Sequence, residues 1–454
     1  MNFTKTCLSL IVSVAAATTL VAGQYETDDE NKCQNGIKVL TPAEIATRSH
    51  DDYAENNYGV ISVEKAVSWI TNWSETKPEG ISGKLFIMQV GDIDGADLNV
   101  HNYIKHNDVD TFTFDRTDGC TDTGNFRNDG VSNVPKPVFS GPEMDGAFMA
   151  YDIDPKKDML LLVLAEPSGS LAAGSLRMWY TMTYWGMNAK NIAVLNGQAG
   201  SVLNPEVNTN LQSFGINTKD DIFVADQSVP PINGTHSIAE VKRDGTILQA
   251  TTGDMMKLVK NGTQNATIID ARSSAEYWGT KQAKTEFKTC GEDGKQQCFT
   301  AFDGHIQSAQ NLLYTNILNT ADKSYTFKDI FEIESLFAGT GYTEGQTAYI
   351  YCRTGTKASM LTFASAAILG NPTRMYDGSW IQWGKMANAI DTNGNELLPT
   401  GTKWRLDISK YSESITANAK GTDFVSPHAE GSLHLDAKHT NAIINEDKAY
   451  KLVR

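Results

Sequence analysis

The feature that most constrains this chain is a strand–helix–strand pattern that occurs twice. Short, unbroken apolar runs indicate strands buried on both faces of a parallel sheet. In each half such a run precedes a helical stretch and a further strand: Met159–Ala165, Ala172–Tyr184 and Ile192–Leu195, then Ala348–Tyr351, Ala358–Leu369 and Arg374–Tyr376. Strands joined through a helix in this way form right-handed crossovers in an open sheet. The repeat predicts an α/β fold class in which one open, mostly parallel sheet with helices on both faces is used twice.

The length of 454 residues also favours two domains with extensions. Additional strands are predicted at Lys84–Val90 and Ala266–Ile269, and a helical pattern extends over Val60–Trp73. We divide the chain into a signal peptide (1–23), a polar N-terminal extension (24–58), a first α/β domain (59–245), a second α/β domain (246–397) and a polar C-terminal tail (398–454). We expect that tail to lie over the surface.

The first residues have the features of an export signal. Lys5 supplies a positive charge, Leu8–Val21 is apolar, and small residues follow up to Gly23. We expect cleavage near the Gly23–Gln24 bond and a periplasmic or secreted mature protein. An uncleaved membrane anchor is the alternative reading, but the apolar run is shorter than the roughly 20 residues that a spanning helix needs.

The formal net charge of the chain is −15. Its long-range field repels nucleic acid and anionic membrane surfaces, so we expect neither as a partner. Basic residues inside a concave pocket can still attract a small anion. No glycine-rich phosphate loop with nucleotide-binding spacing is present, so no cofactor is implied.

Removal of the signal peptide leaves an odd number of cysteines: Cys33, Cys120, Cys290, Cys298 and Cys352. In an oxidising compartment an odd count leaves at least one thiol without a partner in the chain. Cys290 and Cys298 flank a polar loop and are a plausible disulfide, with Cys33 and Cys120 as a second pair. Spacing does not prove this connectivity. No zinc-type cysteine and histidine spacing occurs, so no metal site is predicted.

Cys352 follows a predicted strand and precedes a short loop that leads into a helix. Ligands bind at such positions in open α/β sheets. The loop, Arg353, Thr354, Gly355, Thr356 and Lys357, offers successive backbone N–H groups and two cations. Both features favour a thiolate, which is the nucleophilic form of cysteine. A buried core cysteine is the commoner role for a lone residue, but a core position requires neither the glycine nor the cations.

The segment Tyr351–Ala358, followed by Tyr376-Asp-Gly-Ser-Trp380, resembles the active-site loop of the tandem-domain rhodanese family, the thiosulfate sulfurtransferases. Asp270-Ala-Arg272, Glu276-Tyr277 and Gly304-His305 look like the pattern that opens the family's domain. The resemblance is close over about Val259–Trp383 and weaker in the first half. There Glu166 occupies the position of Cys352, as in the family's non-catalytic domain.

This resemblance implies that 246–397 is a catalytic rhodanese domain and 59–245 a non-catalytic one. Cys352 would attack the outer sulfur of thiosulfate or a related donor, and pass it from a persulfide to cyanide, a thiol or a sulfur-accepting protein. Residues 353–357 would bind the anionic donor. Asp270, Arg272 and His305 would hold the loops in place.

Two positions differ from the vertebrate thiosulfate enzyme. Glu276 stands where that enzyme has a substrate-binding Arg, and Thr354 stands where it has a Lys. The mercaptopyruvate-using branch, whose loop reads Cys-Gly-Ser-Gly, fits less well because Arg353 replaces its first glycine. A cysteine phosphatase is also disfavoured, because the sixth residue after Cys352 is Ala358 and not the phosphate-gripping Arg.

A non-enzymatic role is the second hypothesis. An exported rhodanese fold could carry sulfane sulfur on Cys352 and deliver it to one partner protein, with little turnover of small molecules. The loss of two substrate-binding cations favours this carrier, whereas the retained Cys, Gly and Lys favour catalysis.

Overall fold

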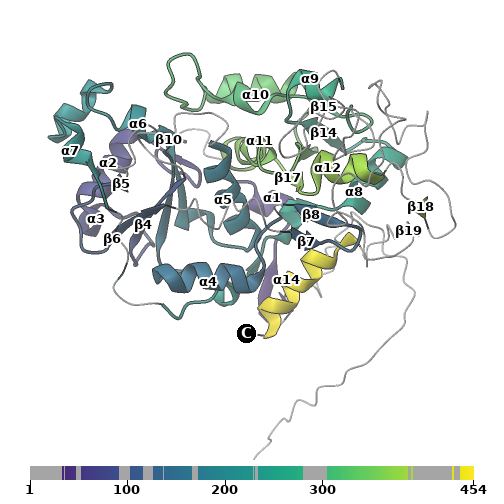
Figure 1. Ribbon diagram of the computed structural model, residues 1–454, viewed down its shortest axis with the longest axis horizontal. Helices are drawn as coiled ribbons and strands as arrows, with labels where there is room; N and C mark the ends of the chain where they lie inside the picture. Colours follow the sequence, from purple (N-terminus) through teal and green to yellow (C-terminus); the bar gives the residue numbers. More distant parts are fainter. Residues whose placement is uncertain are drawn as a thin grey trace, which may run out of the picture.

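The computed structural model describes residues 33–34, 36–47, 53–90, 103–115, 126–135, 137–165, 172–226, 228, 230, 234–279, 304–386, 390–391, 432–433 and 440–453. These residues form two lobes, each built on a five-stranded sheet (Figure 1). The predicted signal peptide and Glu166 lie outside the described residues.

The sheet of the first lobe has the order β3-β10-β9-β4-β6, and all its neighbouring strands are parallel. The strands are β3 (Val60–Ile61), β4 (Leu85–Val90), β6 (Thr111–Asp115), β9 (Met159–Leu164) and β10 (Ile192–Gln198). Every residue of β4 and β9 is buried. Burial on both faces explains why these segments are continuous apolar runs without a polar alternation.

The second lobe repeats this arrangement in the order β13-β17-β16-β14-β15, again with parallel neighbours. The strands are β13 (Gln249–Ala250), β14 (Ala266–Asp270), β15 (Gln310–Asn311), β16 (Thr347–Tyr351) and β17 (Thr373–Tyr376). The chain visits the corresponding positions of both sheets in the same sequence. The prediction of one α/β fold used twice is therefore confirmed.

Two helices meet where the lobes join, α5 (Ala172–Tyr184) of the first lobe and α11 (Ala358–Phe363) of the second (Figure 1). Trp179 on α5 packs edge-on against Phe363 on α11, with ring centroids 5.0 Å apart. One continuous cluster of buried side chains includes residues of both lobes. Both helices were predicted from the sequence, although α11 continues from Ala364 to Ile368 (η7) with the wider π-helical hydrogen-bond spacing.

Further helices pack on the faces of the two sheets. They include α2 (Val63–Thr71), α3 (Trp73–Thr76), α6 (Ala199–Val202) and α7 (Lys219–Ile222) in the first lobe, and α8 (Thr252–Asn261), α9 (Ser274–Tyr277), α10 (Ile330–Ala338) and α12 (Ser379–Lys385) in the second. Residues 60–61, which the sequence pattern places in a helix, form strand β3, and the helix begins at Val63. No helix among the described residues is long and apolar enough to cross a bilayer.

The N-terminal extension contributes to both lobes. Its strand β2 (Ile37–Val39) pairs in parallel with β12 (Arg243–Asp244), in the connection between the lobes. Helix α1 (Pro42–Ile45) follows, and the N–H of Thr47 donates to the carbonyl of Ala366 in the π-helical segment, at 2.8 Å.

The end of the chain forms helix α14 (Ala442–Val453), which packs beside α4 (Gly141–Tyr151) of the first lobe (Figure 1). Ile443 and Ile444 on α14 are buried. Where we expected a polar tail over the surface, the described part of that tail contains a helix whose Ile443 belongs to the buried cluster shared by both lobes.

A hairpin from the first half crosses to the second lobe. It consists of β7 (Phe126–Asn128) and β8 (Asn133–Pro135). Gln382 on α12 donates from Nε2 to Asp129 Oδ2 at 2.7 Å and to Ser132 Oγ at 2.9 Å. The long polar excursion of the first half thus helps to join the lobes.

Candidate active site

Cys352 lies directly after β16, at the carboxyl end of the sheet, and its side chain is 1% exposed. Its backbone N–H donates to Ser379 Oγ at 3.3 Å, and its carbonyl accepts from the N–H of Trp380 at 3.0 Å. Ser379 has a left-handed backbone conformation, with φ of 53°. The segment after β17 therefore holds Cys352 at the start of its loop.

Burial alone suits a core cysteine as well as a nucleophile, but the loop after Cys352 does not suit a core position. Within the described part of the chain, no hydrogen bond is donated by the backbone N–H groups of residues 353–357. Gly355 has a φ of +84°, which glycine adopts without steric cost. Its carbonyl accepts from the N–H of Ser359 at 3.1 Å. Successive backbone N–H groups of this kind form a concave site for an anion.

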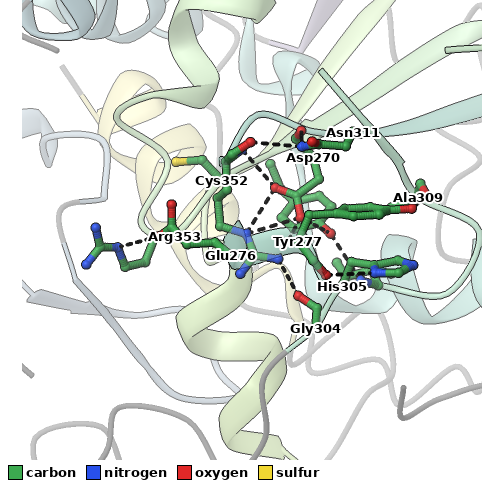
Figure 2. A network of polar contacts seen from close by, with 12 residues as sticks. Asp270, Glu276, Tyr277, Gly304, His305, Ala309, Asn311, Cys352 and Arg353 are labelled. Atoms are coloured by element: carbon green, nitrogen blue, oxygen red, sulfur yellow. Dashed lines mark hydrogen bonds and ion pairs between the residues drawn. The ribbon is translucent and has the colours of Figure 1, made fainter. Parts of the chain in front are cut away.

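The side chain of Arg353 faces Glu276, with Nε 3.7 Å from Oε1 (Figure 2). Arg353 is 31% exposed and Glu276 is 9% exposed. Burial opposes ionisation of Glu276, but the nearby Arg353, Ser273, Arg272 and Lys357 hold its pKa below the usual range. Glu276 is therefore a carboxylate at neutral pH, and it partly neutralises one of the two cations predicted to bind the donor.

Lys357, the second predicted cation, lies over the ring of Tyr314, with Nζ 5.0 Å from the centroid. Tyr314 precedes α10 in the chain and is itself buried. Burial, and then the negative charges of Cys352 and Glu276, raise the pKa of Tyr314. Tyr314 was not predicted as a site residue, and its neighbours in the sequence gave no local signal for that role.

A buried network supports the loops from behind. Arg272 donates from Nε and Nη2 to Asp270, at 3.0 and 2.6 Å, and from Nη2 to the carbonyl of Gly304 at 2.5 Å. The hydroxyl of Tyr351 donates to Asp270 Oδ2 at 2.8 Å. These bonds connect Arg272 and Asp270 to the backbone at Gly304 and to Tyr351, at the end of β16.

His305 belongs to the same support. Its ring stacks on Tyr277, with centroids 3.7 Å apart, and its Nδ1 lies 3.0 Å from the Tyr277 carbonyl. Burial lowers the pKa of His305. Figure 2 shows the ring on the opposite side of the network from the Cys352 sulfur. We therefore assign His305 to the structure of the domain and not to proton transfer.

The first lobe also reaches the loop. Arg177 on α5 pairs with Asp377, which follows β17. Arg177 was not predicted as a functional residue. The signal was present, because it is the only charged residue in the helix Ala172–Tyr184, and a buried charge requires a partner.

Cys352 is the free cysteine of the described residues. The side chain of Cys33 and all of Cys120, Cys290 and Cys298 lie outside them, so the proposed disulfides stay predictions. A search of the described residues finds no group of three or more His, Cys, Asp or Glu side chains that could hold a metal ion.

Comparison with protein families matches residues 251–386 to the rhodanese-like domain. A provisionally named thiosulfate sulfurtransferase of Haloferax volcanii is 31% identical over 150 residues, which are 33% of this chain and 47% of that protein. The sulfur carrier protein TtuD of Thermus thermophilus is 26% identical over 155 residues, 34% of this chain and 50% of TtuD. The matched region thus spans about half the length of these curated relatives.

Among solved structures, the Tum1 protein from Saccharomyces cerevisiae superposes with a TM-score of 0.50. The superposition covers 77% of this chain and 98% of Tum1, at 18% sequence identity. This likeness concerns the fold. The second lobe is a rhodanese-like domain, and the first lobe repeats its architecture.

Proposed function

Because residues 251–386 form a rhodanese-like domain, we propose that this protein is a sulfurtransferase that carries sulfur as a persulfide on Cys352. The observation that carries the proposal is the loop of residues 353–357. Its backbone N–H groups have no acceptor within the described part of the chain, and it starts at a cysteine. Such groups can stabilise a negatively charged sulfur without reorganisation.

In the first step, the Cys352 thiolate attacks the outer sulfur of thiosulfate or a related donor. A new S–S bond forms to Cys352 while the S–S bond of the donor breaks, and sulfite leaves with the electron pair. In the second step, cyanide or a thiolate attacks the outer sulfur of the persulfide. The Cys352–sulfur bond breaks, its electron pair returns to Cys352, and thiocyanate or a new persulfide leaves.

Residues around the loop suit different parts of this cycle. The N–H groups of residues 353–357 are placed to donate to the thiolate and to the outer sulfur of the persulfide. Lys357 supplies a positive charge toward an anionic donor. Arg353 supplies less, because Glu276 pairs with it.

A sulfur carrier remains the second candidate. TtuD, one of the relatives, is named a sulfur carrier protein, and the Glu276–Arg353 pair weakens the attraction for small dianions. In this version Cys352 receives sulfur from polysulfide or from a protein persulfide and passes it to one protein partner.

Intact-mass spectrometry of the purified protein tests the proposal directly. We expect thiosulfate to add one sulfur atom, which maps to Cys352 and disappears after addition of cyanide. Cys352→Ser should neither gain sulfur nor form thiocyanate. If the wild type gains sulfur from polysulfide but not from thiosulfate, the protein is a sulfur carrier and not a thiosulfate sulfurtransferase. If Cys352→Ser still transfers sulfur at the wild-type rate, the mechanism is wrong.

We further propose that the protein is exported and acts in the periplasm or outside the cell. The support is the apolar run Leu8–Val21 after Lys5, and in that compartment Cys33–Cys120 and Cys290–Cys298 disulfides would persist. N-terminal sequencing of protein isolated from its cells should begin near Gln24. A retained Met1 would contradict export through a cleaved signal.

A further inference from the structure

A buried ion pair connects the first lobe to the nucleophile loop of the second. Arg177 Nη1 lies 2.8 Å from Asp377 Oδ1, and Nη2 donates to Oδ2 at 3.0 Å. The two side chains are 4% and 2% exposed. The backbone N–H of Val138, also from the first half of the chain, donates to Asp377 Oδ2 at 3.2 Å. Asp377 is thus held by two groups from outside its own lobe.

The loop rests directly on this pair. A Cβ atom at Gly355 would lie 2.4 Å from Asp377 Oδ1 and 3.0 Å from Arg177 Nη1. A second link ties the following helix to α5, because Ser359 Oγ donates to the Ala173 carbonyl at 3.2 Å. The conformation of the loop therefore depends on the position of α5.

Arg177 is also within electrostatic reach of the nucleophile. Burial opposes the charge of Arg177, but Asp377, Tyr180 and Cys352 favour it, and its pKa is raised. The guanidinium also lies over the ring of Tyr180, 4.9 Å from the centroid.

Other charged or titratable groups approach Cys352 from the elements around it. The loop itself carries Arg353 and Lys357, the segment before α10 carries Tyr314, and α9 carries Glu276. The Asp270–Arg272 pair lies behind the loop, with its two charges bonded to each other. All of these groups belong to the second lobe, whereas Arg177 belongs to the first.

We propose that Arg177, supplied by the lobe without the nucleophile, is a positioning residue of the sulfur-transfer site. Paired with Asp377, it seats Gly355 and compensates the negative charge of Asp377 near Cys352. This inference rests on the proposed function only where it concerns the effect of Arg177 on sulfur transfer. Its effect on the thiol can be measured without any sulfur donor.

The two halves of the pair have opposite expected effects. If Arg177 is replaced by Met, the Asp377 carboxylate is left uncompensated near Cys352, and a negative charge disfavours a thiolate. If Asp377 is replaced by Asn, one negative charge beside Cys352 is removed while the charge of Arg177 stays, which favours the thiolate. A pair that only stabilised the fold would produce no such difference in sign.

The experiment is the pH profile of alkylation at Cys352 by iodoacetamide, followed by peptide mass spectrometry. We expect the pH of half-maximal alkylation rate to rise by about one unit in Arg177→Met and to fall by about one unit in Asp377→Asn. The double variant R177M/D377N should return close to the wild-type midpoint. Shifts in the same direction for both single variants, or no shift in either, would overturn the proposal.

A matched control separates this effect from loss of stability. Arg127 forms another buried pair, donating to both carboxylate oxygens of Asp447 at 3.0 and 2.6 Å, and it anchors α14. Arg127→Met should lower the thermal midpoint of unfolding while leaving the alkylation profile unchanged. If Arg177→Met does not fold, Asp377→Asn and Arg177→Lys carry the test, with Arg177→Lys expected to stay near the wild-type midpoint. If wild type transfers no sulfur, the proposed function fails, but the alkylation profiles still decide the role of Arg177.

Discussion

A single carboxylate alters the charge near Cys352. Glu276 is buried against Arg353 and stays ionised because the surrounding cations lower its pKa. An anionic donor that approaches Arg353 therefore also approaches a negative charge. At the effective dielectric constant of about 20 near a protein surface, two unit charges a few ångströms apart interact with an energy of about a few kcal/mol. The Glu276 carboxylate therefore repels an anionic donor by an energy of this order.

This arrangement predicts that Glu276→Gln improves the use of thiosulfate. The substitution keeps the size of the side chain and frees the charge of Arg353. We expect kcat/KM for thiosulfate to rise about tenfold, equivalent to about 1.4 kcal/mol, mainly through a lower KM. Steady-state kinetics with thiosulfate and cyanide measures this effect.

Glu332 on α10 provides a control, since its side chain is 57% exposed and pairs with Lys328 at 3.9 Å. Glu332→Gln should leave the kinetics unchanged. An unchanged KM in Glu276→Gln would show that this carboxylate does not limit access of the donor.

At the scale of elements, the loop of residues 353–357 combines a tight turn with a helix that contacts the other lobe. The turn requires a left-handed residue at Gly355, directly against Asp377. The helix that follows changes to π spacing at Ala364, and the Ala366 carbonyl accepts from Thr47 of the N-terminal extension. The loop and the helix after it are therefore held by Asp377 and by Thr47, which come from different parts of the sequence.

A pair of glycine substitutions separates backbone strain from contact with the ion pair. Gly355 and Gly345 have nearly equal φ values, +84° and +86°, but only at Gly355 would a Cβ meet neighbouring atoms. Gly345→Ala should cost about 1–2 kcal/mol of unfolding free energy and leave sulfur transfer intact.

Gly355→Ala should abolish most of the activity while the protein stays folded, because the loop must shift away from Asp377. Urea unfolding and thiocyanate formation measure the two effects. Equal activity in both variants would mean that the fit of Gly355 on Asp377 does not matter for transfer.

At the scale of the whole molecule, the C-terminal helix brings buried charges into the first lobe. Asp447 accepts from Arg127 and from the hydroxyl of Tyr184, at 2.7 Å for Tyr184. Lys451 donates to the carbonyls of Trp185 and Arg243. Burial lowers the pKa of Lys451 to about 8. The folded protein therefore binds the Lys451 proton less tightly than the unfolded chain.

This shift predicts a gain of stability at alkaline pH. Between pH 8 and 10 the unfolded state keeps the proton on Lys451 and the folded state releases it, so the free energy of unfolding rises with pH. We expect wild type to gain on the order of 2 kcal/mol relative to Lys451→Met over this range. Urea unfolding of both proteins at each pH isolates the contribution of Lys451.

Lys448→Met on the same helix is the control, since Lys448 is 27% exposed at its pair with Asp244. It should show a smaller pH-dependent difference from wild type. If Lys451→Met and wild type change in parallel with pH, Lys451 does not titrate in this window.

Much of this fold could be predicted from local patterns. The strands β4, β9, β14 and β16 are buried on both faces, so they stand out as continuous apolar runs. Cys352 was recognisable for the same reason, because a cysteine, a glycine and two cations follow such a strand within six residues. The edge strands β3, β13 and β15 have only two residues each, too few for a periodic signal.

The sequence by itself determined the α/β class and the repeat, and it showed that Cys352 and a glycine-containing loop follow a strand, because burial and backbone preference act over a few neighbouring residues. Only the tertiary structure decided which charges meet. Arg177 and Asp377 are 200 residues apart, Arg127 and Asp447 are 320 apart, and Glu276 meets Arg353 across the sheet edge. A buried charge requires a counter-ion, but the local sequence does not specify which one, since the packing of distant elements brings the partners together.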